Sequence, residues 1–94
     1  MAIKSWKHKG LRDFFEKGST RGIQPDQAAK IEIRLDALNA AICPEDMDVL
    51  PSWRFHERKG EGKGTYSVNV SGNWRITFQF ENGDAHVVNY EDPH

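Results

Sequence analysis

Residues 73–94 read NWRITFQFENGDAHVVNYEDPH and contain a guanidinium, a phenol, a carboxylate and an imidazole, from Arg75, Tyr90, Asp92 and His94. Cutting RNA at its own 2′-hydroxyl needs a group that accepts that proton and a group that protonates the leaving 5′-oxygen. It also needs a positive group that holds the charge building on the phosphate. Histidine suits the proton steps near neutral pH, and the arginine fork matches two phosphate oxygens. The set predicts phosphate-handling chemistry that requires no metal.

Each of these residues also has an ordinary structural interpretation. Arg75 could be a solvated arginine on a sheet, and His94 a frayed terminal residue. His56, further up the chain, could be a half-buried strand histidine. Asp92 and His94 could bind a metal together, but two ligands without a third nearby make a weak site. The residues alone leave these alternatives open.

A glycine-rich connection at residues 59–64, KGEGKG, carries Lys59 and Lys63. Lysines among glycines can approach phosphate closely, so both are candidate RNA contacts. The connection is not a P-loop, because the spacing GxxxxGK[ST] is absent. No Ser/His/Asp arrangement is visible either.

The net charge of −1 conceals alternating blocks. Residues 1–22 and 52–75 carry net charges of +4 and +3, whereas residues 23–51 and 76–94 each carry −4. Such blocks can be ordinary mixed surface charge. Basic segments that meet in the fold can nevertheless attract phosphate even when the whole chain is nearly neutral.

The length and composition predict a single domain over residues 1–94, with a modest core. Cys43 is the sole cysteine and cannot form an internal disulfide, which is typical of a reducing compartment. The lysine-bearing N-terminus lacks the apolar segment of a secretory signal, and no apolar run approaches the ~20 residues of a membrane span. We therefore expect a soluble cytoplasmic protein with no membrane partner.

Two helices are expected to position these side chains. A short alternating stretch, Ile3–Trp6, predicts an N-terminal strand. The next segment, His8–Lys17, predicts a helix that ends at Gly18 as its C′ residue. Pro25 suits the first position of a second helix, Asp26–Ile42. That helix shows an apolar stripe at spacings of three and four: Ala28, Ile31, Leu35, Leu38 and Ile42.

Strands are expected to follow the helices. A short strand candidate, Trp53–His56, precedes the glycine-rich connection. Three longer candidates come after it, at Tyr66–Val70, Trp74–Phe80 and Ala85–Glu91. The order of strand, two helices and then antiparallel strands predicts an α+β fold. In this fold the helices pack on one face of a sheet of three to four strands.

The final hairpin can be registered from its turn. The dipeptide Asn82-Gly83 favours a type I′ turn, in which both central residues need positive φ. A two-residue loop there predicts the pairs Glu81–Asp84, Arg75–Tyr90 and Asn73–Asp92.

The preceding hairpin is registered by its apolar pattern. A three-residue loop, Ser71–Asn73, keeps the apolar side chains on one face, whereas a one-residue slip would turn every side chain over. The predicted pairs are Val70–Trp74, Val68–Ile76 and Tyr66–Phe78. The opposite face is then predicted to carry Ser67, Asn69, Arg75, Thr77, Gln79, His86, Tyr90 and Asp92, followed by His94.

Three stretches of the chain resemble one known family. The opening IKSWKHKGLRDFFEKG, the central RLDAL and the closing NWRITFQFENGDAHVVNYEDPH are similar to the signature segments of the HigB-type toxins of the RelE superfamily. The likeness extends over nearly the whole length, with the segments in the same order. On this resemblance the chain is identified as a RelE-like toxin, also called a plasmid maintenance system killer protein.

The resemblance implies a function and partners. It implies an mRNA interferase that cleaves in the A site of the 70S ribosome through the 2′-hydroxyl and uses no cofactor. It also implies a neutralising HigA-like helix-turn-helix antitoxin, through which alone the pair would bind operator DNA.

The resemblance also implies roles for individual residues. His56 and His94 match the proton-transfer groups, in an order that the sequence leaves open, and Asp92 matches the orienting acid. Arg75 matches the arginine that stabilises the phosphate, and Asn73 the residue that positions it. A further set is expected to contact RNA: Lys59, Lys63 and Tyr90.

Two features depart from the family pattern. Pro93 stands where the best-known members have a tyrosine, and proline can neither stack on a base nor donate a hydroxyl. The sequence pI of about 6.4 is low for a ribosome-binding toxin. Both keep open an alternative: a non-catalytic RelE-fold protein that blocks translation or acts only in the antitoxin–repressor complex.

Overall fold

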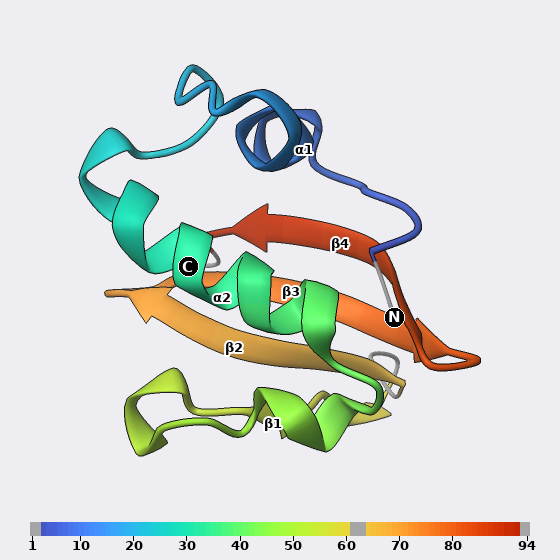
Figure 1. Cartoon of the computed structure of the whole chain (residues 1–94). Helices are drawn as coiled ribbons and strands as arrows, with labels where there is room; N and C mark the ends of the chain where they lie inside the picture. Colours follow the sequence, from blue (N-terminus) through green and yellow to red (C-terminus); the bar gives the residue numbers. More distant parts are fainter. Residues whose placement is uncertain (1–2, 61–63, 93–94) are drawn as a thin grey trace.

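The computed structural model describes residues 3–60 and 64–92, and these form a helical layer and a sheet (Figure 1). The helices are α1 (Lys9–Lys17) and α2 (Ala28–Ala40). The strands are β1 (His56–Glu57), β2 (Thr65–Ser71), β3 (Trp74–Glu81) and β4 (Asp84–Glu91). They form an antiparallel sheet in the order β1-β2-β3-β4. The predicted α+β class is confirmed.

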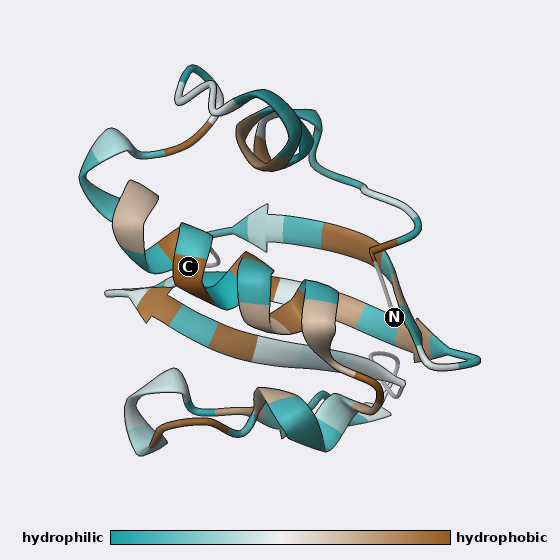
Figure 2. Cartoon of the chain, in the orientation of Figure 1, coloured by the Kyte–Doolittle hydropathy of each residue, from teal (hydrophilic) through white to brown (hydrophobic). Residues whose placement is uncertain are grey.

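The core lies between α2 and the sheet. The helix crosses one face of the strands (Figure 1), and Ile31, Leu35 and Leu38 from its apolar stripe are buried there. They join buried sheet residues that include Ile76 and Phe78 in one cluster, and Figure 2 shows the apolar stretches of β2 to β4 beneath α2.

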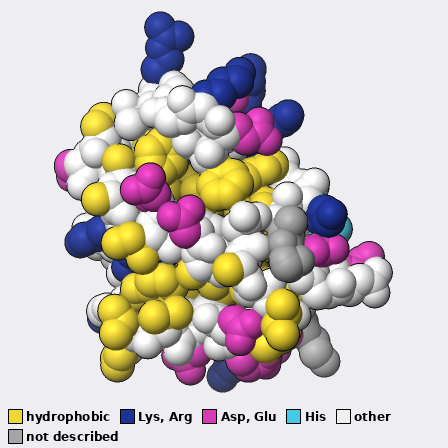
Figure 3. Space-filling model, in the orientation of Figure 1, with side chains coloured by type: hydrophobic (Ala, Val, Ile, Leu, Met, Phe, Trp, Pro, Cys, Tyr) yellow, Lys and Arg dark blue, Asp and Glu magenta, His cyan; other side chains and the backbone are white. Residues whose placement is uncertain are grey.

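The apolar stripe of α2 is shorter than predicted. Ile42 is 70% exposed, because the helix ends at Ala40 and the backbone turns extended at Ala41. Ile42 is one of several large hydrophobic side chains that remain exposed in the part of the chain that the structure describes. Figure 3, viewed from the α2 side, shows hydrophobic side chains among charged ones on this face.

Helix α1 follows its predicted bounds closely. His8 is the N-cap, and its Nδ1 accepts a hydrogen bond from the Leu11 amide at 2.9 Å. The helix ends at Gly18, which adopts the left-handed conformation expected of a C′ residue, with φ of 76°. The side chain of Leu11 is fully buried and ties α1 to the core.

The N-terminal stretch was predicted to be a strand, and this prediction is wrong. Ile3 and Trp6 form only isolated parallel bridges, to Ala85 and Val88 of β4. Between these bridges the Ser5 hydroxyl accepts a hydrogen bond from the amide of Val87. A side chain thus takes up an amide of β4 at this point, and no continuous ladder forms.

The predicted strand Trp53–His56 is also corrected. Residues Pro51–Trp53 form a 3₁₀ turn, and Arg54 closes it with φ of 48°. The strand itself is limited to His56–Glu57, which pair with Ser67 and Tyr66 of β2.

The β2–β3 hairpin has the predicted register in its body. Val68 pairs with Ile76 and Tyr66 with Phe78. The turn is different, because Trp74 pairs with Ser71 and not with Val70, and a bulge between Asn69 and Ser71 absorbs the difference. Helix α2 fixes this end, where buried Arg34 lies 4.6 Å from the Trp53 ring and donates from Nε to the Asn69 carbonyl at 2.8 Å.

The β3–β4 hairpin begins as predicted and then departs from the predicted register. Glu81 pairs with Asp84, and the turn residues Asn82 and Gly83 have φ of 54° and 81°, as a type I′ turn requires. An irregularity follows in β4, where Val87 has φ of 53°. This bulge adds one residue to β4 and reverses the side of the sheet that each later residue faces.

The register after the bulge overturns two predicted pairs. Arg75 pairs with Glu91 and not with Tyr90. The register that would place Asp92 opposite Asn73 is therefore wrong as well. Outward-facing positions in the second half of β4 belong to Asn89 and Glu91.

Candidate active site

The sheet face opposite α2 contains a groove with a volume of about 440 Å³. It is formed by β1, the end of β2, the β2–β3 turn and the start of β3. Its lining is polar and basic: Arg54, His56, Ser67, Asn69, Gly72, Asn73 and Arg75. The groove therefore brings together Arg75, Asn73 and His56, three of the residues predicted from the sequence.

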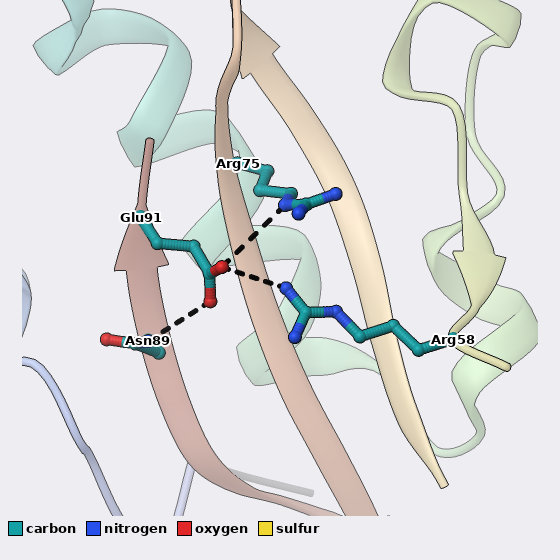
Figure 4. Close-up of polar contacts among 4 residues, drawn as sticks. All are labelled: Arg58, Arg75, Asn89 and Glu91. Atoms are coloured by element: carbon teal, nitrogen blue, oxygen red, sulfur yellow. Dashed lines mark hydrogen bonds and ion pairs between the residues drawn. The ribbon is translucent and has the colours of Figure 1, made fainter. Parts of the chain in front are cut away.

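Arg75 lies on the outer face, where the alternation of β3 predicted it. Its side chain is 29% exposed and lines the groove. Its Nε atom is buried and makes no hydrogen bond. The nearest acid is Glu91, whose Oε2 lies 3.9 Å from that Nε. Figure 4 shows the terminal nitrogens of Arg75 pointing away from Glu91.

Glu91 is also bound by two other side chains (Figure 4). Arg58 donates from Nη2 to Oε2 at 2.9 Å, and Asn89 donates from Nδ2 to Oε1 at 3.3 Å. The exposed fractions of the Arg58 and Glu91 side chains are 30% and 28%, so the pair is partly shielded from water. We call Arg58, Arg75, Asn89 and Glu91 the carboxylate bridge.

Sequence reasoning missed the carboxylate bridge. The predicted register turned Glu91 toward the core, and Arg58 fell beyond the predicted end of its strand. One signal was present: Ala85, Val88 and Tyr90 can share the inner face only if β4 contains one extra residue, and Val87-Val88 is where the alternation fails.

His56 is exposed at the rim of the groove. Its Nδ1 lies 2.8 Å from the carbonyl oxygen of Arg54. Because a carbonyl oxygen can only accept, Nδ1 carries the proton in this contact. In the neutral ring the lone pair is then on Nε2, which suits that atom for proton transfer.

The basic loop residues are less closely tied to the groove. Asn73 is exposed in the β2–β3 turn and lines the groove. Lys59 is exposed after β1 and is not among the lining residues. Lys63 and His94 lie outside the residues that the structure describes, so their predicted roles stay predictions.

Tyr90 does not lie on the outer face, so the predicted placement on which its RNA contact depended is wrong. Its side chain is buried, its hydroxyl donates to Gln27 Oε1, and its ring stacks on Trp74 at 4.5 Å between centroids. Burial raises the pKa of the Tyr90 phenol, and the charges of Asp26 and Asp92 raise the pKa further. Asp92, which is half-buried just beyond β4, therefore acts on Tyr90 electrostatically.

A second hollow of about 120 Å³ lies on the same sheet face. Both Arg58 and Glu91 line it, and hydroxyl and amide side chains surround it: Thr65, Thr77, Gln79 and Asn89. The carboxylate bridge thus lies between this hollow and the larger groove. The two guanidinium groups of Arg58 and Arg75 beside the Glu91 carboxylate suit the binding of an anionic, hydroxyl-bearing chain.

Residues 3–60 and 64–92 show neither a metal cluster nor a membrane-spanning helix. No group of three or more His, Cys, Asp or Glu side chains in these ranges could hold a metal ion. No helix there is long and apolar enough to span a bilayer.

Comparison with known proteins identifies the family. Residues 4–94 match the family model described as RelE-like toxin of type II toxin-antitoxin system HigB. The chain is 46% identical over 92 residues to "Endoribonuclease HigB" of Proteus vulgaris, covering 98% of this chain and 99% of that protein. It is 33% identical over 95 residues to "Toxin HigB-1" of Vibrio cholerae serotype O1, covering 100% and 98%. The chain therefore belongs to the HigB-like family of RelE-like toxins of type II toxin-antitoxin systems.

Proposed function

We propose that this toxin is a ribosome-dependent endoribonuclease that cleaves mRNA in the A site. The observation that carries the proposal is the groove in which Arg75, Asn73 and His56 meet on one sheet face. The name of the Proteus vulgaris relative, which covers nearly the full chain, supports endonuclease activity. The proposed substrate is a single strand, because its 2′-hydroxyl must reach in-line geometry with the adjacent phosphate.

The proposed reaction is an internal transesterification. The 2′-oxygen bonds to phosphorus, the bond from phosphorus to the 5′-oxygen breaks, and the products carry a 2′,3′-cyclic phosphate and a 5′-hydroxyl. His56 transfers one proton through Nε2, whose availability follows from the contact of Nδ1 with Arg54. The terminal nitrogens of Arg75 hold the charge that develops on the phosphate.

The second proton transfer is assigned to the segment after β4. On the family resemblance, His94 transfers this proton and Asp92 orients the imidazole of His94. Either histidine can be the base, because two imidazoles can exchange roles. No metal is needed for these steps in the proposed mechanism.

A type II toxin has an antitoxin partner. We propose that this partner is a HigA-like helix-turn-helix protein, which neutralises the toxin and supplies the contacts to operator DNA. The toxin's own targets are then the 70S ribosome and its mRNA. This places its action in the cytoplasm, where translation occurs.

The test is to express the chain without antitoxin and to map mRNA ends by primer extension. We expect codon-phased cuts that fall to a low residual level in Arg75→Ala and His94→Ala and are reduced at least tenfold in His56→Ala. The new downstream ends should accept phosphate from polynucleotide kinase without prior phosphatase treatment, because transesterification leaves a 5′-hydroxyl.

A matched control is Arg12→Ala, which removes an exposed arginine of α1, away from the groove. This variant should keep the full cleavage pattern. Growth arrest with intact mRNA would favour the non-catalytic blocker instead. Downstream ends that carry a 5′-phosphate would rule out the 2′-hydroxyl mechanism.

A further inference from the structure

Glu91 lies in the middle of the phosphate-handling face, although a carboxylate repels phosphate. Both of its oxygens are used, because Oε1 accepts from Asn89 and Oε2 accepts from Arg58. The same Oε2 lies 3.9 Å from the Nε of Arg75. The position therefore calls for a role other than direct contact with RNA, and the following inference rests on the proposed function.

The geometry divides the Arg75 guanidinium into two sides. Its Nε edge faces Glu91, and its terminal nitrogens point away from that carboxylate (Figure 4). These terminal nitrogens form the fork that matches two phosphate oxygens. A carboxylate on the Nε edge thus restricts the long side chain while leaving the fork to an incoming phosphate.

The charges lead to the same role. Arg58 and Arg75 are two cations that share one neighbouring anion, and all three side chains are about 30% exposed. Without Glu91 the two guanidinium groups would repel each other in a partly shielded site. The anion between them therefore keeps both cations on this face.

The backbone supports this position of Glu91. It faces outward because the bulge at Val87 adds one residue to β4. The bulge is anchored by Ser5, whose hydroxyl accepts from the Val87 amide at 2.9 Å and whose carbonyl accepts from the Val88 amide at 3.1 Å. Bulges beside active sites often re-aim a side chain in this manner.

We propose that Glu91 is a positioning residue for RNA cleavage, which holds Arg75 by its Nε edge so that the terminal nitrogens face the reacting phosphate. Arg58 is the second cation of this arrangement and binds the same Oε2 atom of Glu91 that faces Arg75. Glu91 itself neither transfers a proton nor touches RNA.

The first test is Glu91→Gln, which keeps the shape and removes the charge. On programmed ribosomes we expect kcat to fall at least tenfold, with KM unchanged or lower because a negative charge has left the RNA face. In an Arg75→Ala background the same change should have less than a twofold effect, since Glu91 acts through Arg75. The control Glu81→Gln removes an exposed acid at the far end of β3 and should leave kcat and KM unchanged.

The second test does not depend on cleavage. In ¹⁵N-labelled protein, the Arg75 Nε–H signal should be resolved and slow to exchange, and it should lose both properties in Glu91→Gln but keep them in Glu81→Gln. An Arg75 signal that is unchanged in Glu91→Gln would overturn the inference. An equal loss of kcat in the wild-type and Arg75→Ala backgrounds would overturn it too. If wild-type protein fails to cleave while the Arg75 signal responds as expected, the proposed function fails and the restraint of Arg75 by Glu91 stands.

Discussion

The two long hairpins of the sheet each contain a bulge, but with different consequences. In β2–β3 the irregularity lies beside the turn, between Asn69 and Ser71, and the pairs beyond it have the expected register. In β3–β4 it lies in mid-strand at Val87, so the residues after it face the other side. The position of a bulge thus decides whether it changes a turn or an entire surface.

The two hairpins build different parts of the same sheet face, the groove and the smaller hollow beside it. The first supplies Asn69, Asn73 and Arg75 by simple alternation. The second supplies Asn89 and Glu91 only because alternation is interrupted. Three experiments test this difference between the hairpins.

The largest effect on stability is expected from truncating an inner and an outer residue, one at a time, at the end of β4. Tyr90→Ala should lower the free energy of unfolding by about 3–5 kcal/mol, because it empties a buried aromatic site. Glu91→Ala should cost less than about 1 kcal/mol, as is usual for partly exposed ion pairs. Urea denaturation measures both, and an uninterrupted strand would give the reverse order.

A smaller effect is expected from matched backbone changes in the two hairpins. Gly72 and Val87 have φ of 59° and 53°, where glycine is comfortable and a β-branched residue is strained. Gly72→Ala should therefore destabilise the protein by about 1 kcal/mol, and Val87→Gly should stabilise it by a similar amount.

Thermal unfolding of the two variants should thus shift in opposite directions. The control Val49→Gly, at an exposed valine, should not stabilise. A loss of stability in Val87→Gly equal to that in Gly72→Ala would mean that the bulge in β4 is not strained.

The smallest effect is a pH dependence of stability, which should appear at β4 but not at β2. Burial lowers the pKa of His8, and an interaction of the ring with the backbone of His8 itself opposes this shift. Because the folded pKa lies below the unfolded value of 6.5, the contribution of His8 to stability is present above about pH 6.5. It is lost as the pH falls through the folded pKa. Protonated Nδ1 cannot accept from Leu11, and a cation is unfavourable at a helix N-terminus.

Hydrogen exchange can detect this local loosening. Between pH 7.5 and 5.5, protection of the Val88 amide should weaken relative to that of Val68, by an amount on the order of 1 kcal/mol for a lost cap. His8→Asn keeps a capping side chain without a charge change and should flatten this pH dependence, whereas His86→Asn should not. Equal weakening at both amides would locate the pH effect elsewhere.

These contrasts explain which parts of the molecule the sequence could predict. Helix α2, the Asn82-Gly83 turn and the body of β2–β3 follow from local periodicity and turn chemistry, which act within a few residues. The outward face of Arg75 follows from the same alternation.

The remaining features depend on contacts between distant segments. The bulge at Val87 is fixed by Ser5, from the other end of the chain. The short strand β1 follows a 3₁₀ turn, which an alternating pattern cannot describe. Tyr90 was therefore assigned to the wrong face, and Glu91 and Arg58 were overlooked. His94 and Lys63, at positions that the structure does not describe, remain predictions from the family resemblance.

The hydrogen bond between Ser5 and Val87 also has a consequence for biosynthesis. These residues are 82 positions apart, so a nascent chain must be extended through β4 and released from the exit tunnel before the contact can form. Until then Glu91 has nothing to turn it outward, and Arg75 lacks its restraint. The ribosome that makes this toxin would thus have to extend the chain well beyond Val87 before the protein could acquire a competent cleavage face.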